Sequence, residues 1–189
     1  CVAMTDPEFP KDAIDASHAF RTIMGAVSRP GRILPFIPAQ DCPAPLWATT
    51  ATVARTLCDF QTPVWLAPEL RDEAVLQFIR FHTGAPVASV PDEASFIFLT
   101  AASAELDPAL FTQGTHEYPD RSATLLIQVA ALGNADSVEL TGPGIPLPIK
   151  LKAEDVPTFF WEAMAENHAL FPLGVDVIFV SPDSIAALP

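Results

Sequence analysis

Residues 122–132 read SATLLIQVAAL, one of the two longest apolar runs in the chain. A run of this length, without polar alternation, indicates a strand that is buried on both of its faces. Two other segments have the same character, ASFIFLTA at 94–101 and GVDVIFVS at 174–181, and we expect the latter to be the last strand. Strands buried on both faces need a covering layer on each side, which favours an α/β fold.

The segments around these strands carry helical and short-strand patterns. Helices are predicted over residues 12–28, 45–60, 68–82 and 155–170, with one or two helical turns at 107–114. Shorter strands are predicted at 32–38, 62–68 and 137–142, and the prolines of the first indicate a sheet edge. We therefore predict a three-layer αβα sandwich with a mixed sheet, in a single domain spanning residues 1–189.

The composition limits the partners of the chain. Its 189 residues include 23 Asp and Glu against 10 Lys and Arg, a formal net charge of −13. This charge argues against binding to nucleic acid or to anionic membranes, and no apolar run is long enough to span a bilayer. The first twenty residues show no secretory pattern. Cys1, Cys42 and Cys58 suit neither a disulfide framework nor a zinc site, so we expect a cytoplasmic protein with reduced thiols.

Several common catalytic motifs are absent from the sequence. It contains no GxxxxGK[ST] loop, no strand-linked GxGxxG, no GxSxG elbow and no HExxH. The four histidines stand far apart, so no metal site is predicted. None of the three lysines lies in an apolar segment of the kind that makes a Schiff-base lysine reactive. We therefore expect neither a metal nor a covalently bound cofactor.

The first candidate site is the turn after the first predicted helix. Arg21, Ser28, Arg29 and Arg32 gather around a Ser-Arg-Pro-Gly-Arg sequence in a chain that has few cations. Guanidinium groups bind phosphate or carboxylate through paired hydrogen bonds, so this cluster could clamp an anion. The alternative is that the turn only ends a helix, with its arginines paired to surface carboxylates.

A second candidate is FIRFHTGAP, residues 78–86. His82 could serve as a general acid or base, with Thr83 and Gly84 turning the chain beside it. Equally, His82 could interact with the last helical carbonyls while Gly84 takes the left-handed conformation that ends many helices.

The remaining candidates lie near predicted strand ends. Ser122 and Thr124 stand where the most apolar strand begins, a position that often borders a cleft. Gly142 and Gly144 flank a proline, in a turn whose amides could bind an anion or form a plain β-turn. Asp176 begins the last predicted strand, where burial would require a partner.

Taken together and in order, these blocks resemble one family. FRTIMGAVSRPGR, CDFQTPVWL, FHTGAP, YPDRSATLLIQV, LTGPGI and FPLGVDVIFV are similar to blocks of the PhnH family of the bacterial carbon–phosphorus lyase system, between about residues 20 and 180. The match covers most of the chain. Membership of the family's motifs is carried over to Arg21, Ser28, Arg29, Gly31, Arg32, His82, Thr83, Gly84, Ser122, Thr124, Gly142, Gly144, Gly174 and Asp176.

The resemblance implies a cytoplasmic subunit that dimerises alone and assembles with PhnG, PhnI and PhnJ. It implies that PhnH and PhnL are required beside the nucleosidase PhnI when an alkylphosphonate replaces adenine on ATP, giving ribose 1-alkylphosphonate 5-triphosphate. Radical cleavage belongs to PhnJ. The family's fold is similar to that of the large PLP-dependent transferases, reduced and without PLP. The resemblance also leads us to expect a few residues beyond Pro189 and a native start other than Cys1.

Two main hypotheses for function remain open, and the residues do not decide whether the chain is itself catalytic. One is an interaction subunit of a transferase complex. The other is a stand-alone enzyme or module that binds phosphate or phosphonate, which requires Arg29 or Arg32, His82 and the Gly142 amide to converge around one cleft. A relic fold kept only for dimerisation is a third hypothesis.

Overall fold

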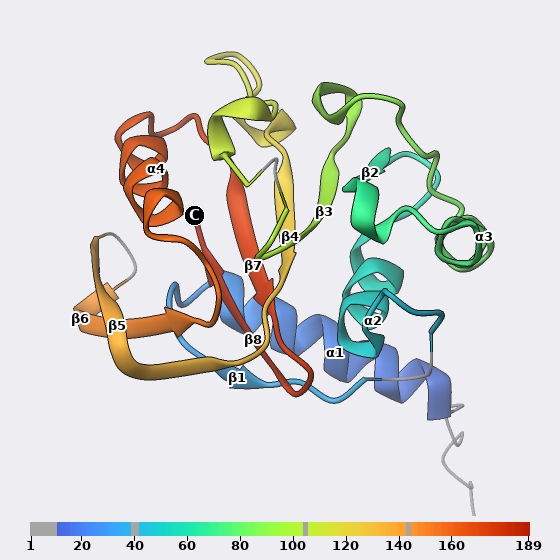
Figure 1. Cartoon of the computed structure of the whole chain (residues 1–189), viewed down its shortest axis with the longest axis horizontal. Helices are drawn as coiled ribbons and strands as arrows, with labels where there is room; N and C mark the ends of the chain where they lie inside the picture. The colour runs from blue at the N-terminus through green and yellow to red at the C-terminus, as the bar shows by residue number, and fades with distance from the viewer. Residues whose placement is uncertain (1–10, 39–41, 104–105, 143–144) are drawn as a thin grey trace, which may run out of the picture.

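The structure, a computed structural model, describes residues 11–38, 42–103, 106–142 and 145–189. Its centre is a six-stranded mixed sheet with the order β1–β8–β7–β4–β3–β2 (Figure 1). Strands β2, β3, β4 and β7 are parallel to one another, whereas β8 and β1 run antiparallel to their neighbours. The predicted α/β fold with a mixed sheet is therefore confirmed. The strands are β1 (Leu34–Pro35), β2 (Val64–Leu66), β3 (Phe96–Thr100), β4 (Thr124–Gln128), β7 (Asp176–Val180) and β8 (Ser184–Leu188).

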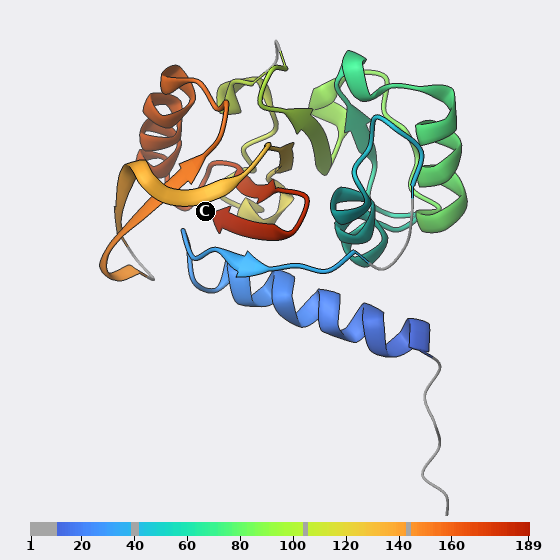
Figure 2. The same ribbon diagram turned by 60° about the horizontal axis from the view of Figure 1, so that its bottom comes forward.

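Both faces of the sheet are covered. The helices are α1 (Lys11–Val27), α2 (Ala48–Leu57), α3 (Glu73–Thr83) and α4 (Thr158–Ala169). Alternate strand residues point to opposite faces, so Phe98 and Leu126 join a core with α1, α2 and α3, whereas Ile97 and Leu125 join a core with α4. Figure 2 shows α1 along one face of the molecule, with its outer side turned away from the rest of the chain.

The layer beside α4 contains a β-hairpin that was predicted only in part. Strands β5 (Leu132–Gly142) and β6 (Ile145–Ala153) form a separate two-stranded antiparallel sheet. Only residues 137–142 of this hairpin were predicted as a strand. Leu151 and Ala153 of β6 are buried in the same core as α4, so this side of the sheet is covered by a helix and a hairpin together.

Two further boundaries differ from the predictions. The strand at residues 176–180 is not the last, because β8 follows it and pairs with it. The helix predicted over residues 68–82 begins only after Asp72, whose side chain accepts a hydrogen bond of 2.8 Å from the Ala74 amide. Pro68–Leu70 form a separate turn of 3₁₀ helix. A side-chain N-cap thus determined this helix start, and not the proline that precedes it.

Among the described residues, none of the helices combines the length and the apolar character that a membrane-spanning segment requires.

Candidate functional site

Polar side chains at the carboxyl ends of the parallel strands are hydrogen-bonded to other parts of the chain. In open α/β sheets, ligands commonly bind outside the carboxyl ends of the parallel strands. Here Gln128, at the carboxyl end of β4, accepts a hydrogen bond of 2.9 Å from the Trp47 amide and donates one of 3.3 Å to the Pro45 carbonyl. Beside it, Ser103 donates to the Glu69 carboxylate.

The turn after α1 is fixed in place by the sheet and by the hairpin. Gly31 has a φ of 75° and donates a hydrogen bond of 2.8 Å to the Ala187 carbonyl of β8. A Cβ atom at this position would lie 2.6 Å from Leu140 Cδ1 and 2.9 Å from Ile149 Cγ2. Both neighbours are side-chain methyl groups of the hairpin, so a larger residue here would have to displace them and would also strain the left-handed backbone.

Two adjoining hollows lie where this turn meets the hairpin. The first has a volume of about 330 Å³, and Pro30, Leu140, Gly142, Trp161 and His168 are among its lining residues. The second is lined by Arg29, Pro30 and Arg32 on one side and by residues 145–149 of β6 on the other. Pro30 and Ile145 line both hollows. We call this continuous surface, from Trp161 and His168 to Arg29 and Arg32, the hairpin groove.

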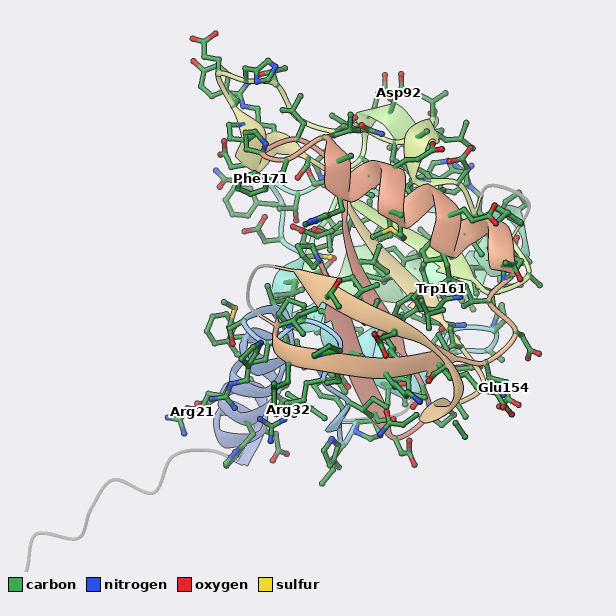
Figure 3. All side chains as sticks on the ribbon, turned by 90° about the vertical axis from the view of Figure 1, so that its left-hand side faces the viewer. Arg21, Arg32, Asp92, Glu154, Trp161 and Phe171 are labelled. Atoms are coloured by element: carbon green, nitrogen blue, oxygen red, sulfur yellow. The ribbon has the colours of Figure 1, made fainter. Side chains whose placement is uncertain are left out.

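The apolar end of the hairpin groove is held by α4. Trp161 stacks against the core, with its ring 5.5 Å from that of Phe179. Figure 3 shows Trp161 between α4 and the hairpin and Arg32 near the end of α1. The buried Asn167 side chain fixes the end of α4, because it accepts a hydrogen bond of 2.8 Å from the Val175 amide and donates one of 3.0 Å to the Val175 carbonyl. His168 follows Asn167, and its Nε2 atom lies 3.7 Å from the position that a Gly142 Cβ would occupy.

The cationic end of the hairpin groove is electrostatically unpaired. Arg29 and Arg32 are exposed, and neither side chain forms an ion pair or hydrogen bond with any residue that the structure describes. The turn does end α1, since the Ser28 amide donates to the Met24 carbonyl over 2.9 Å. The alternative in which these arginines pair with surface carboxylates of the described chain is not observed. Their guanidinium donors are thus available to an external anion.

The second candidate turn lies apart from this groove. In Figure 1, α3 and the hairpin stand at opposite sides of the molecule. His82 packs on Phe78, with ring centroids 4.4 Å apart, and the Thr83 hydroxyl donates to the Ile79 carbonyl over 2.7 Å. Gly84, with a φ of 72°, is the left-handed cap of α3. The predicted convergence is therefore not complete: Arg29 and Arg32 line one hollow and Gly142 lines the adjoining one, whereas His82, Thr83 and Gly84 belong to the end of α3 on the other side of the molecule.

Two of the strand-end candidates, Thr124 and Asp176, lie together between the sheet and α1. Thr124 and Asp176 are opposite each other in the register of β4 and β7 and line a hollow of about 170 Å³ with Met24 and Val27. Removal of the carboxyl group from water against these apolar neighbours raises the pKa of Asp176. Ser122 forms an isolated antiparallel bridge with Gln113 instead.

The remaining candidate residues are Arg21, Gly142, Gly144 and Gly174. Arg21 is exposed on α1, and Gly142 ends β5 beside His168. Gly144 lies outside the described residues. Gly174 has a φ of 122°, and a Cβ there would lie 2.9 Å from Asn167 Oδ1.

Two groove residues were missed by the sequence analysis. Trp161 and His168 belong to a helix that was predicted, but nothing in the helix indicates which strand it faces. The signal that could have revealed the hairpin is the alternation of apolar residues with prolines and lysines through IPLPIKLK, residues 145–152.

Within the described ranges, no three His, Cys, Asp or Glu side chains are grouped so that they could hold a metal ion.

The fold and the groove define a mixed-sheet α/β protein with a β-hairpin docked beside the end of its first helix. Comparison with known proteins places it more closely. Residues 7–189 match the model of the family described as "Bacterial phosphonate metabolism protein (PhnH)". The chain belongs to the PhnH family.

Two curated relatives support this assignment. The chain is 38% identical over 187 residues to alpha-D-ribose 1-methylphosphonate 5-triphosphate synthase subunit PhnH of Rhizobium meliloti (strain 1021), with 99% of this chain and 91% of the relative covered. It is 32% identical over 173 residues to the putative C-P lyase subunit protein HtxG of Stutzerimonas stutzeri, with 90% and 81% covered.

Proposed function

We propose that this protein is a subunit of a carbon–phosphorus lyase system in phosphonate catabolism. In this role it is required, with partner subunits, for the formation of ribose 1-alkylphosphonate 5-triphosphate from ATP and an alkylphosphonate. The observation that carries the proposal is the similarity, over nearly the whole of both chains, to a relative named as the PhnH subunit of the synthase of that product.

The surface of the protein supports a role in assembly. Phe20, Met24 and Val27 recur at helical spacing on α1 and are 50%, 44% and 43% exposed. Contiguous apolar surface of this kind marks protein–protein contacts in many soluble proteins. The hollow that Met24 and Val27 line with Asp176 continues this surface toward the sheet.

The partners that we propose are PhnG, PhnI, PhnJ and PhnL, with a homodimer when the protein is alone. We place the complex in the cytoplasm. The expectation that the fold is a reduced relative of the PLP-dependent transferases remains part of this proposal. It is consistent with a mixed six-stranded sheet that has helices on both faces.

A phosphate-binding module that uses the arginines without His82 is the second candidate, since α3, which carries His82, lies at the opposite side of the molecule from the hairpin. It is favoured by one observation: Arg29 and Arg32 line the hairpin groove and have no ion-pair partner among the residues that the structure describes. A binding groove and a place in a complex are compatible.

The proposal is tested by complementation. A bacterium that uses methylphosphonate as its phosphorus source would be deprived of its own carbon–phosphorus lyase genes. It would then receive the PhnG, PhnI, PhnJ and PhnL homologues from the source of this chain, with their remaining pathway genes, and with or without the chain itself. We expect growth on methylphosphonate only when the chain is present, equal growth of both strains on phosphate, and co-purification of the chain with its partners. Equal growth of both strains on methylphosphonate would refute the proposal.

A further inference from the structure

We propose that the hairpin groove binds an organic phosphate with a flat apolar part, of which nucleoside phosphates are the representative class. The ring system would occupy the hollow beside Trp161 and His168, and the phosphates would lie at Arg29 and Arg32. This inference rests on the groove alone, and it holds or fails independently of the subunit role.

The size of the first hollow limits what can occupy it. Ligand pockets commonly measure about 300–1,000 Å³, so a hollow of about 330 Å³ accepts one ring system and leaves no room for a polyphosphate chain. The rest of such a ligand must extend into the adjoining open hollow. Pro30 and Ile145, which line both hollows, mark the path between them.

The lining of the first hollow suits a heterocycle. Trp161 provides an aromatic surface that is half-buried against the core, and Leu140 and Met164 add apolar walls. A ring held against an aromatic side chain gains stacking energy beyond the burial of its area. The exposed His168 imidazole lies at the same wall and offers one donor and one acceptor in its neutral form, which are the groups that ring nitrogens require.

Charge fixes the direction of the ligand. Glu139 lines the first hollow, and its carboxylate repels phosphate there, whereas Arg29 and Arg32 line the second hollow. In a protein with a net charge of −13, most of the surface disfavours a polyanion. Arg29 and Arg32, three residues apart and without an ion-pair partner in the described part of the chain, form a local exception, and each can donate paired hydrogen bonds to phosphate oxygens.

The cationic end is also preorganised. Gly31 holds the turn against the hairpin and the sheet. On the opposite wall, Pro146 and Pro148 restrict the backbone of β6. A site whose walls are already fixed loses little conformational entropy when it binds a ligand.

The experiment measures binding of ATP, tripolyphosphate and adenosine by titration calorimetry, at low salt, to the full chain and to its complex with partner subunits. We expect ATP to bind more tightly than either tripolyphosphate or adenosine. Arg29→Ala combined with Arg32→Ala should weaken the binding of ATP by at least about tenfold. His168 is exposed, so we expect His168→Ala to leave the fold intact. This variant should weaken the binding of ATP and of adenosine and leave the binding of tripolyphosphate unchanged.

The matched control removes the same charge from another face. Arg71 and Arg80 are exposed beside and within α3, so Arg71→Ala combined with Arg80→Ala changes the net charge equally and should leave ATP binding within about twofold. Tripolyphosphate binding as tightly as ATP would overturn the assignment of the ring pocket. Equal losses in the two double variants would overturn the assignment of the phosphate end. Failure of ATP to bind in the millimolar range, to the chain and to the complex alike, would overturn the whole inference.

Discussion

Two turns of this protein look alike in sequence and have different surroundings. Each ends a helix, each carries an arginine a few residues before a glycine, and the two glycines, Gly31 and Gly84, have φ values of 75° and 72°. The turn after α1 lies against the hairpin and lines a groove. The turn after α3 completes its own helix with local hydrogen bonds. The same local signal therefore specifies a helix end in both places, and tertiary contacts alone decide which turn borders a site.

The largest effect that sharpens this comparison is on stability. Gly31→Ala adds a methyl group that meets Leu140 and Ile149 and forces a left-handed alanine, and we expect it to cost about 2–4 kcal/mol. Gly84→Ala has only the cost of a left-handed alanine backbone, about 1–2 kcal/mol. The nearest atom to its added Cβ is Phe60 Cβ, at an ordinary contact distance of 3.8 Å. Urea unfolding of both variants measures the difference.

Gly133→Ala provides the control for this pair. It lies in β5 with no atom within 4 Å of an added Cβ, so a change below about 0.5 kcal/mol is expected. Equal losses at Gly31 and Gly84 would contradict the close docking of the first turn on the hairpin.

A separate measurement tests the core beneath the second turn through its buried thiol, Cys58. On the side of α3, burial raises the pKa of Cys58 to about 12, with a further contribution from the neighbouring Asp59 carboxylate. Since the thiolate is the reactive form, alkylation of Cys58 by iodoacetamide at pH 8 should be at least about a thousandfold slower than that of an unperturbed thiol. Peptide mass spectrometry of native and urea-unfolded protein measures this. Fast native alkylation of Cys58 would show that the core beneath the second turn opens readily.

The smallest expected effect concerns the carboxyl group of Asp176, which lines a hollow beside α1. Burial raises the folded-state pKa of Asp176 above its unfolded value, so the folded state binds the proton more tightly. Stability is then lost as pH rises from the unfolded pKa through the folded pKa, and the penalty persists at neutral pH. Asp176→Asn removes this penalty. Because the residue is partly exposed and screened by solvent, we expect thermal unfolding at pH 7 to rise by at most about 2 °C.

The gain from Asp176→Asn should shrink as the pH falls toward the unfolded-state pKa of about 3.9 and disappear below about pH 3, where the carboxyl group is protonated in both states. A destabilised variant at pH 7 would instead show that the ionised carboxylate makes a favourable contact.

The sequence was sufficient for elements with strong periodicity and insufficient where prolines or small residues hid a strand. The apolar runs of β3, β4 and β7 and the extent of α1 were predicted. Strand β6 was not predicted, although apolar residues alternate through it, because its two prolines, Pro146 and Pro148, are residues that strands disfavour. Strand β8 was missed because its sequence, SIAAL, contains two alanines and has little strand propensity of its own; its pairing with β7 stabilises it.

The candidate site was predictable to the same extent. Arg29 and Arg32 could be singled out because they cluster in a chain with few cations. Trp161 and His168 could not, since their role depends on how α4 lies across the hairpin, which is a tertiary arrangement. His82 was singled out by a pattern that fits any capped helix, and the structure places it away from the groove.

The most direct test of the account compares the two turns in a functioning pathway. In the complementation strain described above, Arg29→Ala with Arg32→Ala would be set against Arg80→Ala with His82→Ala, and consumption of methylphosphonate would be measured for equal amounts of co-purified complex. We predict a loss of at least about tenfold for the first pair and no change for the second. Equal rates for the two pairs, or a loss confined to the second, would contradict the assignment of the site to the turn at the hairpin.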